Sequence, residues 1–425
     1  MTIQINRRKL LKLAAFAPLS LMGLTQINSK TGAKVVIVGG GFGGATCARY
    51  LKNIAPELQV TLIEKEEQIV TCPFSNTVIS GQNDINYISH SFDGLKKDGI
   101  TVLRGLVISV EPKTKTIKLH DGSIVQFDRL VLSPGIDFKW DHIEGYNEQT
   151  STIIPHAWKG GSQTALLRKQ IEAMDDGGTV LISVPRNPFK CPPGPYERAS
   201  LIASYLTKYK PRSKIILFDD KDKFSKQKLF TDAWKNIYGE MIEWIPFSEK
   251  GSTTHIDVPG MTLHSEFASQ RADVINIIPP QKASNLVHTI GLTENTDWCE
   301  VNQSTFESKI IPNIYILGDS TIAGEMPKSG FSAASQAKCC AHAIIAEIFD
   351  FPQPEPSFIN TCYSLISANY GISVVAVYRV DQSGIIKSIK GAGGLSPRDE
   401  DLEFRELEAD YARAWYENFT KELYG

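Results

Sequence analysis

A cysteine held among prolines is the group best placed for chemistry in this sequence. The segment Phe189–Glu197 reads Phe-Lys-Cys-Pro-Pro-Gly-Pro-Tyr-Glu, with Cys191 near its centre. A short apolar run rich in β-branched residues, 179–184, precedes it, as expected of a buried parallel strand. A helical pattern follows to about Tyr209, and then a second strand-like run, 214–218. The loop therefore presents a sulfur atom at the turn of a βαβ unit.

This unit lacks the glycines that a dinucleotide would need. In nucleotide-binding βαβ units, glycines form a tight turn and let backbone N–H groups approach the pyrophosphate. Here prolines, which have no N–H, and a cysteine take their place. We interpret the unit as a former NAD site that now presents sulfur.

A complete glycine-rich loop occurs near the N-terminus, after an apolar strand predicted for 34–38. Gly39, Gly41 and Gly44 fit G-x-G-x-x-G, a helical pattern follows, and Glu64 ends the next strand. The glycines permit the turn, the helix N-terminus faces the pyrophosphate, and the carboxylate accepts from the ribose hydroxyls. These residues predict a dinucleotide site.

Later segments favour FAD over NAD as that dinucleotide. The strand 129–132 ends in Ser-Pro-Gly, with Gly135 at the turn, and resembles the second FAD fingerprint of two-dinucleotide flavoproteins. Another strand, 314–317, leads to Asp319, which matches the aspartate that holds the ribityl chain in that superfamily. Lys328 then precedes a helix whose positive end would suit the flavin pyrimidine edge. An alternative interpretation of this last segment is that its small residues only allow close packing of the helix.

Length and composition set the outer limits. A chain of 425 residues is expected to form two or three domains. A net charge of −2 does not indicate the excess of basic residues that nucleic-acid binding requires. The stretch Asn6–Lys12 contains paired arginines and precedes an apolar run too short to span a bilayer. It resembles a twin-arginine export signal, which predicts a periplasmic protein. The alternative is a chance basic stretch before an uncleaved anchor.

The seven cysteines form no C-x-x-C pair, so we expect no zinc ribbon, no other metal site and no c-type haem on this chain. Four of them are most simply small buried hydrophobes: Cys47, Cys299, Cys339 and Cys340.

Four segments together resemble the flavoprotein subunit of flavocytochrome c sulfide dehydrogenase: Thr71–Asn76, the Cys191 loop, Met326–Gly330 and Asn360–Ser364. The resemblance runs from about Lys34 to the C-terminus. It implies an α/β fold of the glutathione-reductase-like, two-dinucleotide-binding type, with a small α+β C-terminal domain.

The predicted organisation has four parts. These are a signal and linker (1–33), an FAD-binding domain (34–145 and 291–350), an inserted NAD-binding-like domain without its glycine loop (146–290), and a C-terminal domain that covers the flavin or forms an interface (351–425).

The resemblance also implies roles for single residues. Cys72 matches the cysteine that forms an 8α-thioether to FAD, although the following Pro-Phe is not the family's usual pair. Cys191 and Cys362 match the redox disulfide, Glu197 a glutamate proposed for acid–base work, and Trp415 the tryptophan near the flavin ring. From the residues alone, the two cysteines could be structural or core thiols, the glutamate a surface carboxylate, and the tryptophan plain packing.

The function that the resemblance implies is oxidation of sulfide to sulfur or polysulfide through the disulfide and FAD, with electrons passed to a c-type cytochrome. One alternative is a sulfide:quinone oxidoreductase. Another, of a different class, is a non-catalytic flavin-binding subunit that docks a haem protein. An NAD(P)H-dependent disulfide reductase is disfavoured by the missing second glycine loop.

Overall fold

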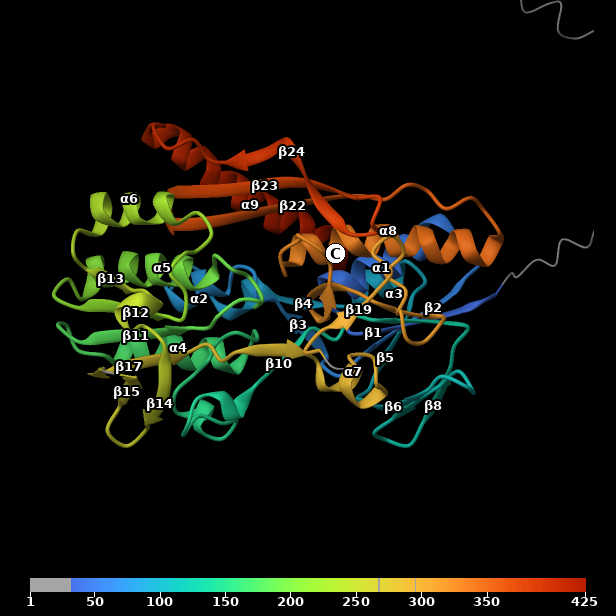
Figure 1. Cartoon of the computed structure of the whole chain (residues 1–425), viewed down its shortest axis with the longest axis horizontal. Coiled ribbons are helices and arrows are strands. Elements are labelled where there is room, and N and C mark those ends of the chain that lie inside the picture. The colour runs from blue at the N-terminus through green and yellow to red at the C-terminus, as the bar shows by residue number, and fades with distance from the viewer. Residues whose placement is uncertain (1–31, 267, 295) are drawn as a thin grey trace, which may run out of the picture. The chain divides into compact units, whose positions relative to one another are not determined.

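Two separate parallel β-sheets form the framework of the chain, which we describe from a computed structural model covering residues 32–266, 268–294 and 296–425 (Figure 1). The twin-arginine segment lies outside these described residues. The first sheet has the order β20-β9-β1-β2-β5, and every neighbouring pair is parallel. Its strands are β1 (Lys34–Val38), β2 (Gln59–Glu64), β5 (Thr101–Arg104), β9 (Arg129–Leu132) and β20 (Ile314–Ile316). Helices α1 (Phe42–Ile54) and α8 (Gly330–Phe349) pack against each other beside this sheet.

The second sheet has the order β13-β12-β11-β17 and is also parallel throughout. Its strands are β11 (Thr179–Val184), β12 (Lys214–Asp219), β13 (Ile242–Ile245) and β17 (Val274–Ile277). The helices associated with it are α4 (Ser162–Ala173), α5 (Gly194–Tyr209) and α6 (Gln227–Tyr238). Strands β11 and β17 are almost wholly buried, as their apolar composition requires.

A third, antiparallel sheet closes the structure near the C-terminus: β22 (Ser357–Ser367), β23 (Tyr370–Val380) and β24 (Ile386–Leu395). Strand β22 contacts both α5 and α8, and so joins the two parallel-sheet regions. In Figure 1 this red and orange layer lies along the helices of both regions. The last helix, α9 (Leu402–Tyr424), packs on β23 and β22.

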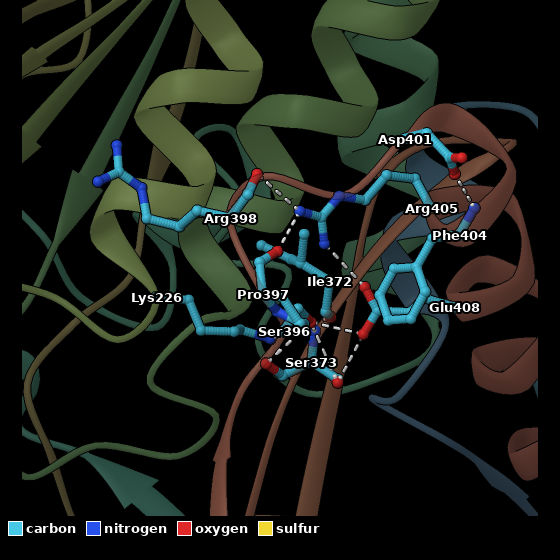
Figure 2. Close-up of polar contacts among 10 residues, drawn as sticks. All are labelled: Lys226, Ile372, Ser373, Ser396, Pro397, Arg398, Asp401, Phe404, Arg405 and Glu408. Atoms are coloured by element: carbon cyan, nitrogen blue, oxygen red, sulfur yellow. Dashed lines mark hydrogen bonds and ion pairs between the residues drawn. The ribbon is translucent and has the colours of Figure 1, made fainter.

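Helix α9 is anchored by a buried ion pair. Arg405 Nη1 lies 3.1 Å from Glu408 Oε2, and both side chains are almost fully buried. The carboxylate also accepts from the hydroxyls of Ser373 (2.8 Å) and Ser396 (2.5 Å), which belong to β23 and to the segment before α9 (Figure 2). Because every charged atom of Glu408 has a partner, the pair can be kept away from water.

The remaining elements are short. They are α2 (Ser75–Ile79), α3 (Asp93–Lys97), α7 (Asn285–Ile290), β3 (Gln68–Val70), β4 (Ser89–Ser91), β6 (Val107–Glu111), β7 (Thr116–Leu119), β8 (Ile124–Gln126), β10 (Ile136–Phe138), β14 (Thr253–Asp257), β15 (Thr262–Ser265), β16 (Ser269–Arg271), β18 (Gln281–Ala283), β19 (Cys299–Glu300) and β21 (Thr321–Ile322), with 3₁₀ turns at 85–88, 140–142, 150–152, 247–249 and 318–320. Within the described part of the chain, no helix has the length and apolar character needed to cross a bilayer.

The strands predicted around both βαβ units are confirmed, and α1 starts at Phe42, directly after the loop. Cys47, Cys299 and Cys340 are buried as predicted. The prediction for Cys339 is wrong, because this residue is only partly buried. Its thiol lies on the α8 side that meets the start of β22 and donates to the Ser357 carbonyl at 3.6 Å.

Candidate active site

The Cys191 loop connects β11 to α5 and is fixed by backbone contacts. The N–H of Cys191 donates to the Lys328 carbonyl at 2.7 Å, and its own carbonyl accepts from Gly194 N–H at 2.9 Å. Cys191 has a left-handed backbone (φ +57°), which is uncommon for a residue with a side chain. The thiol is therefore held between the N-termini of α5 and α8.

The same loop is unsuited to a pyrophosphate. Pro192, Pro193 and Pro195 remove backbone donors from the first turn of α5, and Glu197 brings a carboxylate to it. At Gly194, a Cβ would lie only 3.0 Å from Cys191 Sγ and 2.8 Å from the Trp158 ring. The glycine is thus needed for close packing around sulfur, and the helix end faces a thiol.

Cys362 lies in β22 and is tied to α8 through Asn360. The Asn360 amide nitrogen donates to Cys362 Sγ at 3.3 Å, while its oxygen accepts from the hydroxyls of Ser329 (2.6 Å) and Ser332 (3.0 Å). Ser329 is also the N-cap of α8, accepting from Ser332 N–H at 3.0 Å. The sulfur of Cys362 is consequently positioned by the start of α8.

Cys72 completes a group of three sulfurs. Its thiol donates to the Trp158 carbonyl at 3.5 Å, and its carbonyl accepts from Ser75 N–H at the start of α2. Burial raises the pKa of Cys191 well above its usual value, and negative charge on Cys72, Cys362 or Glu197 raises it further. Cys72 and Cys362, from two distant segments, therefore both lie within electrostatic reach of Cys191.

Glu197 is oriented by two donors. Its Oε1 accepts from Leu365 N–H in β22 at 2.9 Å, and its Oε2 accepts from the Asn76 amide of α2 at 2.9 Å. Burial raises the pKa of Glu197, although these two hydrogen bonds and the charges of Lys226 and Arg198 oppose the shift. A carboxyl group beside thiols can exchange protons with them, and its raised pKa makes it a stronger base than an ordinary glutamate.

Arg198, the next residue of α5, connects the elements around the site through buried hydrogen bonds. Its guanidinium is 1 % exposed and donates to Asn76 Oδ1 (3.0 Å), Asn276 Oδ1 (2.7 Å) and the carbonyls of His156 and Ala157. Burial lowers the pKa of Arg198 to about 10. The residue links α2, α5 and β17 to the segment that carries Trp158.

The glycine-rich loop after β1 has the form that a dinucleotide needs. A Cβ at Gly39 would lie 2.4 Å from the Ser133 carbonyl, and one at Gly44 only 1.9 Å from the Gly39 carbonyl. In contrast, a Cβ at Gly41 would meet no described atom within 4 Å. Glu64 is fixed by Gly40 N–H, which donates to its Oε2 at 2.7 Å. The loop is thus closely packed except at Gly41, where there is space beside the backbone.

The two later FAD segments adjoin each other. The Ser320 hydroxyl, next to Asp319, donates to the carbonyl of Gly135, which itself has a left-handed backbone (φ +75°). Asp319 Oδ1 is shielded from solvent and has no partner among the residues that the structure describes. Burial raises the pKa of this carboxyl. A buried acceptor without a donor fits a ligand hydroxyl, so Gly41, Glu64 and Asp319 together fit FAD.

Comparisons with known proteins agree with this geometry. Family models match at residues 164–279 (sulfide dehydrogenase [flavocytochrome c] flavoprotein chain, central), 354–424 (flavocytochrome c sulphide dehydrogenase, flavin-binding) and 33–166 (pyridine nucleotide-disulphide oxidoreductase). The flavoprotein chain of a flavocytochrome c sulfide dehydrogenase from Chlorobaculum thiosulfatiphilum is 58 % identical over 45 residues, which is 11 % of this chain and 94 % of that sequence.

This chain belongs to the flavocytochrome c sulfide dehydrogenase flavoprotein family.

More distant relatives are similar over most of the chain. The mitochondrial sulfide:quinone oxidoreductase of Mus musculus is 23 % identical over 335 residues, 76 % of this chain and 72 % of the mouse protein. The solved structure of the sulfide:quinone oxidoreductase of Aquifex aeolicus superposes with a TM-score of 0.70 at 18 % identity, covering 92 % of each chain. The predicted two-dinucleotide flavoprotein fold is confirmed, and the family assignment makes the chain an FAD-dependent oxidoreductase acting on sulfide.

Lys328 and Trp415, the other two predicted cofactor residues, both contact the region at the start of α8. The Lys328 ammonium donates to the carbonyls of Asp319 (2.9 Å) and Thr321 (2.7 Å) and lies 3.7 Å from the centre of the Trp298 ring. It therefore connects α8 to the Asp319 turn. Trp415 of α9 is partly buried and stacks on Phe331 at the start of α8, with ring centres 5.9 Å apart.

The sequence interpretation missed four polar residues of the site: Asn76, Arg198, Lys226 and Asn360. Asn76 and Asn360 lie inside two of the segments that carry the family resemblance, close in sequence to Cys72 and Cys362. Their positions could therefore have indicated that they belong to the site. Arg198 and Lys226 gave none, because their partners are far away in sequence.

Replacement of Gly41 tests the FAD site without disturbing the fold. Because the added methyl of Gly41→Ala meets no described atom, we expect the apoprotein to keep its thermal stability while FAD affinity falls by about tenfold or more. The measurements are the flavin-to-protein absorbance ratio and FAD titration of the apoprotein. Gly394→Ala, at another open position, is the control and should retain FAD. Unchanged FAD affinity in Gly41→Ala would contradict the assignment.

Proposed function

We propose that this chain oxidises sulfide to zero-valent sulfur or polysulfide through a Cys191–Cys362 disulfide, and passes the electrons by way of FAD to a c-type cytochrome. The observation that carries the proposal is the convergence of three thiols and Glu197 at the N-termini of α5 and α8. Both Cys191 and Cys362 are free cysteines in the structure.

The first step is thiol–disulfide exchange. Hydrosulfide attacks one sulfur of the disulfide, a new S–S bond forms to the incoming sulfur, and the old S–S bond breaks to release a thiolate. The attacked cysteine then carries a persulfide. Glu197, held by Leu365 and Asn76, takes the proton of the incoming sulfide or returns one to a leaving thiol.

Over the full reaction, hydrosulfide loses two electrons and a proton and becomes zero-valent sulfur. Bound FAD supplies a two-electron acceptor that can release electrons singly, which matches a two-electron substrate to a one-electron haem. The chain's own contribution is to hold the sulfurs, place the carboxyl group and exclude a nicotinamide. The prolines of the Cys191 loop support that exclusion.

Family membership and the charge of α9 support a cytochrome as acceptor. The exposed side of α9 carries Glu403, Glu406, Asp410 and Glu417, which would be repelled by an anionic membrane surface. A quinone remains the second candidate, because the sulfide:quinone oxidoreductases are similar over most of the chain. A non-catalytic subunit that docks a haem protein is the third.

We also propose that the protein is exported through its paired arginines and works in the periplasm, where a disulfide persists. A thioether between Cys72 and FAD belongs to the same proposal. Cys72 lies within electrostatic reach of Cys191, which supports a place beside the flavin.

An anaerobic sulfide titration of the FAD-loaded protein tests the disulfide mechanism. We expect sulfide to bleach the flavin absorbance of the wild type and to leave Cys191→Ser unreduced, because serine cannot form the S–S bond that sulfide attacks. Cys339→Ser, which changes a partly buried thiol outside the site, is the matched control and should bleach like the wild type.

Bleaching of Cys191→Ser at the wild-type rate would remove the disulfide from the mechanism. Absence of bleaching in the wild type would favour the docking subunit. Oxidised cytochrome c or a water-soluble quinone is then added to the reduced protein. Rapid reoxidation by cytochrome c alone supports the proposed acceptor, whereas reoxidation by quinone alone supports the second candidate.

Unfolding tests the thioether at Cys72. If the link exists, acid precipitation of the wild type leaves the flavin on the polypeptide, and a Cys72 peptide gains the mass of the cofactor. Cys72→Ser should release its FAD under the same treatment while Cys299→Ser retains it. Complete release of FAD from the wild type would contradict covalent attachment.

The pH dependence of turnover tests Glu197. Because its pKa is raised, the group loses its proton at a higher pH than an ordinary glutamate, and activity that needs the carboxylate rises through that region. We expect Glu197→Gln to lower kcat/KM for sulfide by about 10²-fold and to remove this limb of the profile. Glu243→Gln, at an exposed position of β13, is the control. A limb unchanged in Glu197→Gln would assign it to another group.

A further inference from the structure

Lys226 is a buried cation that the steps above do not use. It lies directly before α6, is 4 % exposed and has a left-handed backbone (φ +61°). Its ammonium donates to the carbonyl of Cys362 at 2.8 Å and to the hydroxyl of Ser364 at 2.8 Å. A third acceptor, the Ile372 carbonyl of β23, lies 3.5 Å away. The charge is thus held against the strand segment that carries Cys362.

Neutral acceptors only partly compensate a charge removed from water. Burial accordingly lowers the pKa of Lys226 to about 8, and the groups that oppose this shift are Cys362 first, then Glu197, Cys191 and Glu408. Among these groups, a negative charge on Cys362 therefore opposes the shift most. A negative charge on that cysteine is therefore the change that would stabilise Lys226 most.

The other charged groups around this point already have partners. Glu408 is paired with Arg405 at 3.1 Å and accepts from two serine hydroxyls, as Figure 2 shows beside Lys226. Both carboxylate oxygens of Glu197 also have donors, Leu365 N–H and the Asn76 amide. From β23, Tyr378 lies within electrostatic reach of Cys362, but burial raises the pKa of its hydroxyl to about 12, so it stays neutral.

Negative charge reaches Cys362 whichever sulfur is attacked. Attack on Cys191 leaves a persulfide there and releases Cys362 as a thiolate. Attack on Cys362 leaves a persulfide there and releases Cys191 as a thiolate, and negative charge reaches Cys362 when the persulfide proton passes to the Cys191 thiolate or to the Glu197 carboxylate. The total charge is conserved in the exchange, since the hydrosulfide charge moves onto the protein sulfur. We propose, on the basis of the proposed function, that Lys226 is a positioning residue that orients Cys362 and balances the negative charge on its sulfur after the disulfide opens.

Alkylation of Cys362 tests this role without sulfide. The FAD-loaded full chain carrying Cys191→Ser is reduced and treated with iodoacetamide over a range of pH, and the Cys362 peptide is followed by mass spectrometry. Because only the thiolate reacts, loss of the nearby cation in Lys226→Met should move the half-maximal pH upward by about 1 unit and slow alkylation at neutral pH by about tenfold.

Lys226→Gln keeps a hydrogen-bond donor without the charge and should show the same shift. If Lys226→Met fails to fold, the glutamine variant alone tests the proposal. Lys210→Met is the matched control, because Lys210 is also buried and donates to the backbone carbonyls of Glu172 and Met174. Its alkylation profile should match that of the Cys191→Ser parent. A Lys226→Gln profile that overlays the Lys226 parent would overturn the proposal. Failure of the sulfide titration with a positive alkylation result would instead reject only the disulfide reaction.

Discussion

The site depends on the path of one strand, β22, between the N-termini of two helices. Along it, Asn360 binds the capping serine of α8, Cys362 presents its sulfur, and Leu365 N–H binds Glu197 of α5. These contacts are made on one continuous strand, whose spacing is set by its pairing with β23. A shift of β22 by one residue would reverse which side chains face the helices, so the register of the strand fixes the distance between the sulfur, the carboxyl group and the flavin region.

The two central cysteines meet different surroundings, although they belong to one proposed pair. Cys191 lies before the N-terminus of α5, where burial and nearby negative groups disfavour its thiolate. Cys362 lies beside the Lys226 ammonium and accepts a hydrogen bond from Asn360 at 3.3 Å. An opened disulfide in this environment would place its negative charge on the Cys362 side. The asymmetry arises from β22 and the Lys226 turn, and therefore from tertiary structure.

Local patterns in the sequence predict much of this structure. Apolar β-branched runs and the glycine spacing predict β1, β11, β12 and the FAD loop, because these signals depend on neighbouring residues. The family resemblance brings Cys72, Cys191, Cys362 and Glu197 together. The residues that hold them cannot be predicted in this way: Arg198 and Asn76 are 122 positions apart, and Lys226 and Cys362 are 136 apart. The burial of Lys226 arises only when the α6 turn meets β22, and the partial exposure of Cys339 likewise depends on where β22 begins.

Helix α9 covers the predicted FAD loop on one side and bears on the proposed electron acceptor on the other. Its inner face makes three aromatic contacts near the cofactor region. Tyr424 donates to the Gly40 carbonyl at 3.1 Å, and Phe419 stacks on Phe42 with ring centres 5.3 Å apart. The Tyr416 hydroxyl lies 2.6 Å from that of Thr71, the residue before Cys72. A helix that must cover the FAD loop in this way cannot also turn its aromatic side toward a bilayer. Its solvent-exposed surface is rich in carboxylates, and Leu407 and Tyr411 are exposed beside them. A partner that takes electrons over this helix would therefore be recognised by basic side chains, as a soluble haem protein can be, and the attraction would weaken with ionic strength.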